Sequence, residues 1–235
     1  MKKFLLTFLF LTILVSTFAS APKNQYVKIK TIYGDCIIRL YNETPKHRDN
    51  FIKLIKQGFY NGTLFHRVIQ NFMIQGGDPD SKDTGKAKPD AELGNGSVGY
   101  TIPAEFSDSL FHKRGVLAAA RDDNPEKASS GCQFYIVEGK RFTDSKLDSL
   151  KKTKLKGRKI PELQMEYYKS VGGVPHLDQN YTVFGEVITG IDMVDRIAAV
   201  KTNKNDRPLN DVPMTVSLLN RKQCRQLDKI LYPGR

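Results

Sequence analysis

The feature that most constrains the fold of this chain is a series of short apolar runs separated by glycine-rich polar loops. The first two runs, in residues 26–41, alternate between apolar and polar side chains around Gly34 and Asp35 and therefore indicate a β-hairpin. Further strands are expected at residues 64–69, 72–75, 116–120, 133–137, 182–187 and 214–219. Many short strands with turn signals between them predict a mostly β protein, a closed antiparallel barrel capped by helices.

Two helices are expected to cap this barrel. The first can be capped by Thr44, has Pro45 in its first turn and ends near Gly58. Its apolar face consists of Phe51, Leu54 and Ile55. The second helix is expected at about residues 191–200.

Two polar stretches interrupt the strand pattern. Residues 81–95 have the composition of a loop, whereas residues 143–173 contain helical patterns at 147–155 and 162–171. The apolar residues of 143–173 are too few for an independent core. We therefore expect this segment to be a partly helical insertion on the barrel and not a second domain.

The amino-terminal residues have the pattern of a secretory signal. Lys2 and Lys3 precede an apolar run at residues 4–15, and small residues follow near Ala19 and Ala21. We expect a signal peptide at residues 1–21, cleaved after Ala19 or Ala21, and a periplasmic or secreted mature protein that is not inserted in the membrane. An uncleaved anchor is the alternative, although the run is short for a bilayer span of about 20 residues.

The formal net charge is +12, and part of the excess is concentrated in a basic block at residues 151–159. The cations of this block are Lys151, Lys152, Lys154, Lys156, Arg158 and Lys159. The block could dock on an anionic surface, in which case binding would be sensitive to salt. We favour a solvated loop or helix face. No aromatic residues interleave to stack bases, so no nucleic-acid partner is expected.

The cysteines exclude a disulfide-stapled scaffold, because Cys36, Cys132 and Cys224 allow at most one bridge. Pairing of Cys36 with Cys224 stays open. Cys132 is interpreted as core packing in preference to a redox switch. Neither the cysteines nor the histidines have the spacing of metal ligands, so no metal site is expected.

Residues 65–78 carry the chemistry of the chain, with the sequence FHRVIQNFMIQGGD. Met73 and Gln75 should share one face, because side chains alternate along a strand. Arg67 adds a donor fork that is always charged. This combination suits a neutral ligand with apolar bulk and a carbonyl group. It offers no nucleophile, phosphate cradle or metal cage.

Three other polar residues invite catalytic roles that we do not assign to them. His66 is adjacent to Arg67 on the expected strand, so it should face the opposite way and is interpreted as structural. Asp78 and Asp178 are interpreted as turn formers and not as a carboxylate pair.

The stretch 65–78 resembles the signature of the cyclophilins, which are peptidyl-prolyl cis-trans isomerases. Further blocks resemble the same family in the expected order. They are GVLAAA at 115–120, SGCQFYI at 130–136, HLD at 176–178 and YTVFG at 181–185. The resemblance covers about residues 26–142 and 174–219. It implies a closed eight-stranded cyclophilin-like barrel within residues 22–220, with the insertion at about 143–173 and a tail at 221–235.

The resemblance also implies roles for individual residues. Arg67 matches the catalytic arginine, and Gln75 matches the glutamine that holds the substrate carbonyl. The walls of the proline pocket are matched by Phe72, Met73, Tyr135 and Leu177. The substrate groove and its rim are matched by Ala120, Arg121, Gln133 and Thr84. No cofactor is implied, and the implied partners are proline-containing polypeptides bound by a monomer.

The chain departs from the best-known cyclophilins at several pocket positions. His176 occupies the position of a tryptophan, Tyr181 that of a histidine and Arg121 that of a common asparagine. Tyr135 stands where many relatives have phenylalanine. These changes put cyclosporin binding in doubt more than isomerisation. The expected function is therefore an exported prolyl isomerase that assists protein folding, and the alternative is a binding or holdase-like module with poor turnover.

Overall fold

The computed structural model describes residues 24–82, 92–155 and 157–233. The expected signal peptide and Thr84 lie outside these residues. Among the residues that the structure describes, no helix is both long and apolar enough to span a bilayer.

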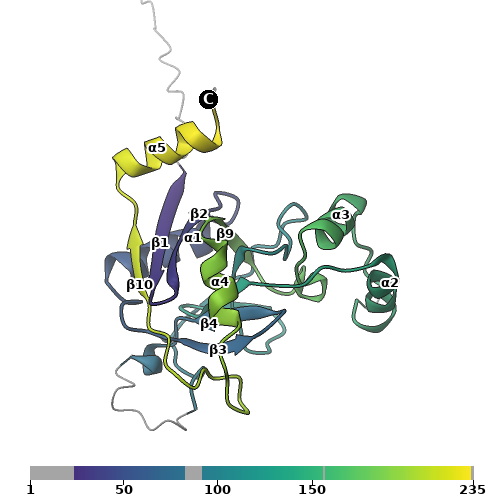
Figure 1. Ribbon diagram of the computed structural model, residues 1–235, viewed down its shortest axis with the longest axis horizontal. Coiled ribbons are helices and arrows are strands. Elements are labelled where there is room, and N and C mark those ends of the chain that lie inside the picture. Colours follow the sequence, from purple (N-terminus) through teal and green to yellow (C-terminus); the bar gives the residue numbers. More distant parts are fainter. Residues whose placement is uncertain (1–23, 83–91, 156, 234–235) are drawn as a thin grey trace, which may run out of the picture.

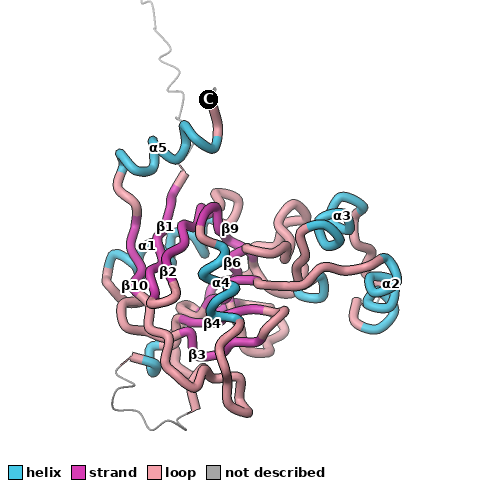
Figure 2. Tube along the Cα trace, in the orientation of Figure 1, coloured by secondary structure: helices cyan, strands magenta, loops and turns pink. Residues whose placement is uncertain are grey.

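One eight-stranded antiparallel sheet forms the body of the fold (Figures 1 and 2). The hairpin expected around Gly34 is formed by β1 (Gln25–Thr31) and β2 (Gly34–Leu40). The other strands are β3 (Phe65–Ile69), β4 (Met73–Gly76), β6 (Val116–Ala119), β8 (Phe134–Val137), β9 (Val183–Thr189) and β10 (Thr215–Leu218). Their order in the sheet is β10-β1-β2-β9-β6-β8-β4-β3.

The sheet curls until its two edge strands approach each other, but strand pairing between them is limited. A single bridge joins Leu64 to Pro213, and the backbone N–H of Phe65 donates to the carbonyl of Val212 at 3.0 Å. On the other side of this bridge, the N–H of Met214 donates to the carbonyl of Thr63 and the N–H of Gly62 donates to the carbonyl of Met214, both at 2.9 Å. The structure therefore shows a curled antiparallel sheet, and it does not confirm the continuous closure that we expected.

Alternation along the central strands divides the apolar side chains between two faces. Leu117 and Ile136 belong to the main core, whereas their neighbours Ala118 and Tyr135 belong to a second apolar cluster on the opposite face. This is the two-residue period of a strand that is buried on both faces. The second cluster forms the base on which the candidate site is built.

Helices α1 (Pro45–Lys56) and α4 (Ile191–Ala198) fill the main core. From α1, Phe51 packs against the rings of Phe134 and Phe184, each at a centroid distance of 5.4 Å. Burial of each such side chain contributes about 1.5–3 kcal/mol to folding. Thr44 occupies the expected N-cap position, but its buried hydroxyl makes no capping hydrogen bond and has no partner among the described residues.

Glu105 supplies the side-chain acceptor that Thr44 does not provide at the start of α1. The carboxylate of Glu105 accepts hydrogen bonds from the backbone N–H groups of Lys46 and His47, both at 3.0 Å. These N–H groups have no partner within the helix, and a negative charge at a helix amino terminus is favourable. The cap therefore comes from a distant part of the chain.

Residues 143–173 contain α2 (Asp144–Thr153) and α3 (Glu162–Ser170), which extend to one side of the sheet (Figure 1). They share a small third cluster of buried residues, namely Phe111, Leu147, Leu155, Ile160 and Tyr168. Gly173 joins this segment to the body by bridging to Lys113 and Lys140. A Cβ on Gly173 would lie 2.2 Å from the carbonyl oxygen of His112, so this close approach requires glycine.

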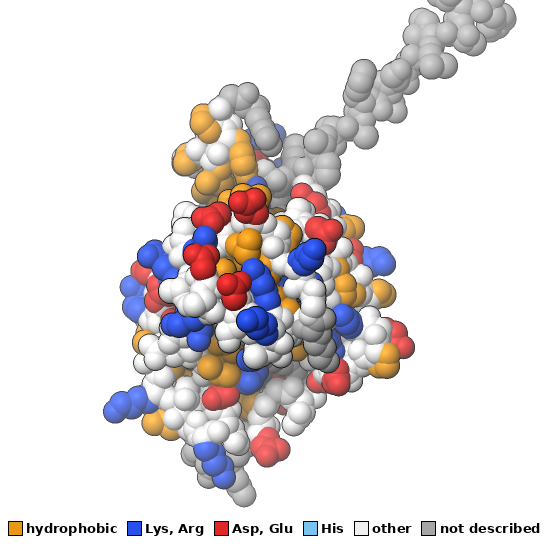
Figure 3. Space-filling view, turned by 90° about the vertical axis from the view of Figure 1, so that its right-hand side faces the viewer, with side chains coloured by type: hydrophobic (Ala, Val, Ile, Leu, Met, Phe, Trp, Pro, Cys, Tyr) orange, Lys and Arg blue, Asp and Glu red, His pale blue; other side chains and the backbone are white. Residues whose placement is uncertain are grey.

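The basic block of this segment is partly neutralised. Lys151 pairs with Asp148 at 3.1 Å, and Arg158 reaches the carboxylate of Asp178 at 3.6 Å. Seen from this side of the molecule, lysine and arginine side chains are interspersed with acidic ones (Figure 3). Lys156 lies outside the described residues. These pairings favour a solvated surface of mixed charge for residues 151–159 over a purely basic docking surface.

Two short strands and one α-helix were not predicted from the sequence. Strands β5 (Thr101–Ile102) and β7 (Ser129–Ser130) pair with each other and are too short to show a period. Helix α5 (Arg221–Leu231) begins with a capping box between Asn220 and Gln223. Its Asp228 accepts the hydroxyl hydrogen of Tyr26 at 2.6 Å, so the tail is tied to β1.

The three cysteines are free thiols. Cys132 is buried in the main core. Burial raises the pKa of the Cys36 thiol to about 12, which disfavours the reactive thiolate.

Candidate active site

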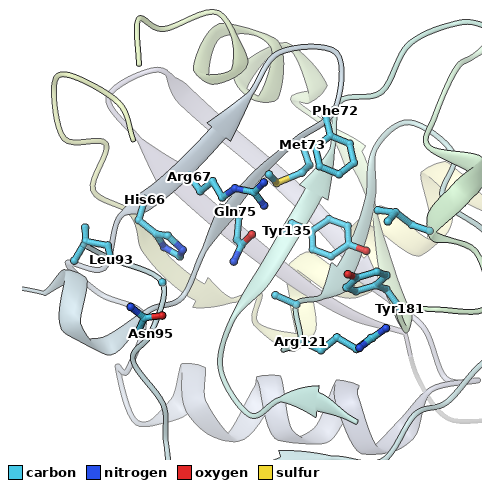
Figure 4. Close-up of a pocket in the computed structure, with 13 residues that line it drawn as sticks. His66, Arg67, Phe72, Met73, Gln75, Leu93, Asn95, Arg121, Tyr135 and Tyr181 are labelled. Carbon is cyan, nitrogen blue, oxygen red and sulfur yellow. The ribbon is translucent and has the colours of Figure 1, made fainter. Parts of the chain in front are cut away.

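The candidate site is a cavity of about 280 Å³ on the second face of the sheet (Figure 4). The β3–β4 hairpin builds one side, because Arg67 pairs with Gln75 in the strand register. Figure 4 shows Arg121 and Tyr181 on the other side. The residues that line the cavity are His66, Arg67, Phe72, Met73, Gln75, Leu93, Gly94, Asn95, Ala120, Arg121, Tyr135, Leu177 and Tyr181.

The apolar part of the cavity consists of Phe72, Met73, Tyr135 and Leu177. These residues come from the β3–β4 turn, β4, β8 and the short helix η2 (Pro175–Leu177). Met73 is 2 % exposed and Tyr135 3 %, so neither is free to move far. Three separate parts of the chain therefore hold the walls of one apolar cleft.

Arg67 extends over the cavity from β3 and remains partly open to solvent, with 44 % of its side chain exposed. Its Nε lies 3.5 Å from a carboxylate oxygen of Asp206. Such an exposed pair contributes at most about 1 kcal/mol. Asp206 can thus orient the guanidinium while the other N–H groups remain available to a ligand.

Gln75 is oriented by a second amide. Its side-chain nitrogen donates to Gln133 Oε1 at 3.1 Å, and Gln133 in turn donates to the carbonyls of Gly94 and Gly96 at 2.8 and 3.0 Å. A side-chain amide has two N–H donors. The second N–H of Gln75 can therefore bind a carbonyl oxygen in the cavity.

Gln133 does not line the cavity itself. It lines an adjoining hollow of about 470 Å³, which shares Gln75, Ala120 and Arg121 with the cavity. The two hollows therefore adjoin each other at these shared residues. An extended segment seated in the apolar cleft can continue into the adjoining hollow.

Aromatic and cationic contacts support the rim of the cavity. The guanidinium of Arg121 lies over the ring of Tyr181 at 4.9 Å, and Tyr181 meets Tyr135 edge-on. His176 does not line the cavity; its ring stacks on Phe72 at 5.9 Å from behind. Burial lowers the pKa of His176 to about 4, so its imidazole is neutral at neutral pH.

The expectation that His66 faces away from Arg67 is wrong. The register of β3 against β4 shifts between Phe65 and Arg67, and this bulge turns His66 toward the cavity. The residue is 3 % exposed, and neither ring nitrogen has a hydrogen-bond partner among the described residues. Burial lowers the pKa of His66 to about 4, so a neutral imidazole faces the site.

Other lining residues also had no sequence signal. Leu93, Gly94 and Asn95 come from a polar loop without periodicity. Asp206 does not line the cavity, and this partner of Arg67 comes from a turn more than 100 positions later in the chain. Asp178 was interpreted as a turn former, but it is 2 % exposed and lies at the centre of a buried hydrogen-bond network.

The arrangement limits the chemistry that the site can perform. It combines a charged donor, an oriented amide and an apolar cleft, and the lining contains no serine, cysteine or lysine nucleophile. Among the described residues, no group of three or more histidines, cysteines or acidic residues could hold a metal ion. The geometry suits a neutral chain segment with an apolar ring and a carbonyl group.

Residues 26–217 match the family model described as cyclophilin type peptidyl-prolyl cis-trans isomerase/CLD. A protein assigned as a peptidyl-prolyl cis-trans isomerase in Staphylococcus saprophyticus is 37% identical over 180 residues, which cover 76% of this chain and 83% of that protein. Its counterpart in Staphylococcus aureus is 36% identical over 187 residues, which cover 79% and 87%.

A protein of Streptococcus pyogenes assigned as a bifunctional phosphatase/peptidyl-prolyl cis-trans isomerase is 38% identical over 189 residues. The chain covers 37% of the length of that protein. Among solved structures, a cyclophilin type peptidyl-prolyl cis-trans isomerase of Cryptosporidium parvum matches with a TM-score of 0.60 and 25% identity, over 84% of this chain and 99% of that one. The same protein was also crystallised in the presence of the dipeptide Ala-Pro.

Proposed function

The chain belongs to the cyclophilin-type peptidyl-prolyl cis-trans isomerases, and we propose that it acts on exported polypeptides and assists their folding. The reaction is rotation about an X–Pro amide bond, opposed by a barrier of roughly 18–20 kcal/mol from amide resonance. Uncatalysed exchange takes tens to hundreds of seconds and can limit the rate of folding.

Catalysis requires the enzyme to bind the twisted amide more tightly than the planar one. In the twisted state the proline nitrogen becomes pyramidal and regains a lone pair. A hydrogen-bond donor aimed at that lone pair stabilises this geometry alone. We assign this role to Arg67, because its guanidinium reaches over the apolar cleft and keeps N–H groups free.

The other groups hold the two ends of the rotating bond. The cleft formed by Met73, Tyr135 and Leu177 accepts the proline ring, and Phe72 closes its outer end. The free N–H of Gln75 binds the carbonyl of the residue before proline. The observation that carries this proposal is the pairing of Arg67 with Gln75 across the hairpin, beside the cleft.

A peptide assay tests the site. The mature domain should accelerate the cis-to-trans conversion of a short X–Pro peptide, and Arg67→Ala should lower kcat about 100-fold or more, the usual cost of removing a preorganised donor. Arg225→Ala, which removes an exposed cation on α5, is the matched control and should retain full activity. Unchanged kcat in Arg67→Ala would reject the assignment.

Export is proposed on the amino-terminal pattern of Lys2, Lys3 and the apolar run at 4–15. Mass spectrometry of the protein from its native cells should find a chain that begins at Ser20 or Pro22. An intact chain in the cytoplasm would contradict export. Acceleration of the slow refolding phase of a proline-limited secreted protein tests the folding role.

A holdase-like function is the second candidate, motivated by the departures at His176 and Tyr181. It predicts suppression of client aggregation that survives Arg67→Ala. If suppression requires Arg67, isomerisation accounts for the effect and the second candidate fails.

A further inference from the structure

A buried polar network runs beneath the proline cleft. His112 Nε2 lies 2.8 Å from the hydroxyl of Tyr135, and His112 Nδ1 lies 2.9 Å from Asp178 Oδ1. The backbone N–H of His112 also donates to Asp178 Oδ1 at 2.8 Å. A carboxylate only accepts, so Nδ1 carries a hydrogen that it donates to Asp178, and Nε2 shares the second hydrogen bond with the hydroxyl of Tyr135.

The other oxygen of Asp178 is held by the segment 143–173. The hydroxyl of Tyr168, on α3, donates to Asp178 Oδ2 at 2.7 Å. Arg158 Nη2 lies 3.6 Å from the same oxygen and donates to the carbonyl of Pro175 at 2.5 Å. Tyr168 is fully buried. The segment therefore reaches the network with one phenol and one guanidinium.

Two walls of the cleft depend on this carboxylate. Asp178 follows Leu177 directly at the end of η2, and it holds Tyr135 through His112. A phenylalanine ring at position 135 would have no such connection. The hydroxyl of Tyr135 thus links the wall of the cleft to a segment that lies outside the sheet.

We propose that the segment 143–173 positions the proline cleft through the chain Tyr168–Asp178–His112–Tyr135. Tyr168 and Arg158 are positioning residues, because they act through Asp178 and do not line the cleft. The segment sets how tightly the enzyme holds proline, and sequence changes within it would tune affinity for X–Pro segments. The inference rests on the proposed role of Tyr135 and Leu177 as cleft walls.

The effect should appear in KM and not in kcat. The cleft holds the proline ring both before and during rotation, so a displaced wall weakens ground-state and transition-state binding equally. A variant that merely lost stability would contain less active enzyme, which lowers the apparent kcat and leaves KM unchanged. The two cases can therefore be separated.

Tyr168→Phe is the direct test, because it removes one hydroxyl and keeps the buried ring. We expect KM for a short X–Pro peptide to rise about three- to tenfold, the range for one lost hydrogen bond, with kcat unchanged. Tyr167→Phe is the matched control on the same helix. The Tyr167 ring contacts Phe111 and Lys113 at the surface, so KM should stay at the wild-type value.

A double-mutant cycle tests the route. In a Tyr135→Phe background the connection to His112 is already absent, so Tyr168→Phe should raise KM by a smaller factor than in the wild type. An equal factor in both backgrounds would overturn the proposed route. An unchanged KM in Tyr168→Phe, measured on folded protein, would overturn the proposal itself. Loss of activity in Arg67→Ala alongside that result would leave the proposed active site intact.

Discussion

Two buried histidines flank the same cavity and differ in their partners. Both ring nitrogens of His112 are hydrogen-bonded, to Asp178 and to Tyr135, whereas neither ring nitrogen of His66 has a partner among the described residues. In the proposed function, His112 supports the wall side of the site, which holds proline through Tyr135 and Leu177, and His66 belongs to the β3 side, which carries Arg67. Beneath the cleft wall the polar groups are bonded to one another, whereas on β3 the imidazole of His66 lines the cavity without such a partner.

The contrast has a physical basis. A fully bonded buried network is rigid, and it is costly to disrupt because each group would lose its partner in a medium of low polarity. A buried imidazole without a protein partner lowers stability, and a hydrogen bond from a ligand would compensate for that cost. We therefore expect changes on the wall side to alter the free energy of unfolding and the affinity for X–Pro peptides. Changes on the β3 side should alter the catalytic rate and the pH dependence of stability.

The largest loss of stability is expected when Asp178, the shared acceptor of the buried network, is removed. Asp178→Ala would leave His112, Tyr168 and Arg158 without their common acceptor, and loss of a buried charged partner costs roughly 3–5 kcal/mol. Urea denaturation monitored by tyrosine fluorescence measures the free energy of unfolding. Asp195→Ala, which removes a half-exposed partner of Arg114, is the control and should cost about 1 kcal/mol or less. Equal losses of unfolding free energy in Asp178→Ala and Asp195→Ala would show that the buried network contributes no more than an exposed ion pair.

The stability of the protein should depend on pH through His66 on β3. His66 has a native pKa of about 4, below the ordinary value of 6.5 for the unfolded chain, so the unfolded state binds more protons between these values. The contribution of His66 to the free energy of unfolding should therefore be fully present above about pH 6.5 and should be lost as the pH falls toward 4. At pH 5 the loss should be on the order of 1–2 kcal/mol.

Unfolding curves at pH 7.5, 6 and 5 measure this dependence. His66→Phe, which cannot titrate, should lose less stability over the same interval. The dependence should be reduced and not abolished, because the pKa of His176 is also about 4. An identical pH profile in the variant would show that His66 does not contribute.

The smallest effect is expected at the mouth of the site. Asp206 makes an exposed ion pair with Arg67, and such pairs contribute less than about 1 kcal/mol. Asp206→Asn should therefore change kcat/KM by no more than about fivefold, and the change should shrink at high salt. A loss as large as that of Arg67→Ala would mean that Asp206 positions the guanidinium far more strictly than its exposure suggests.

Much of the site could be predicted from the sequence, because it depends on local periodicity. Alternation places Met73 and Gln75 on one face of β4, and the structure brings both into the cavity with Arg67. Alternation also separates Tyr135 from the main core. The family resemblance added Leu177 and Tyr181, which come from distant segments.

The remaining features depend on tertiary contacts that local patterns do not contain. The bulge that turns His66 inward is a property of the pairing between β3 and β4 and not of either sequence alone. Glu105 supplies the side-chain acceptor at the start of α1 from about 60 residues away. The role of Asp178 depends on the packing of α3 against the body. The start of α5, in contrast, could have been predicted from Asn220 and Gln223.

The measurement that tests the account most directly is the rate of rotation of the peptide while it is bound. Exchange spectroscopy on a saturated complex of the enzyme with an X–Pro peptide gives this rate separately from affinity. If Arg67 stabilises the twisted amide, Arg67→Ala should slow the bound exchange about 100-fold or more while the peptide still binds. Bound exchange at the wild-type rate in Arg67→Ala would contradict the account.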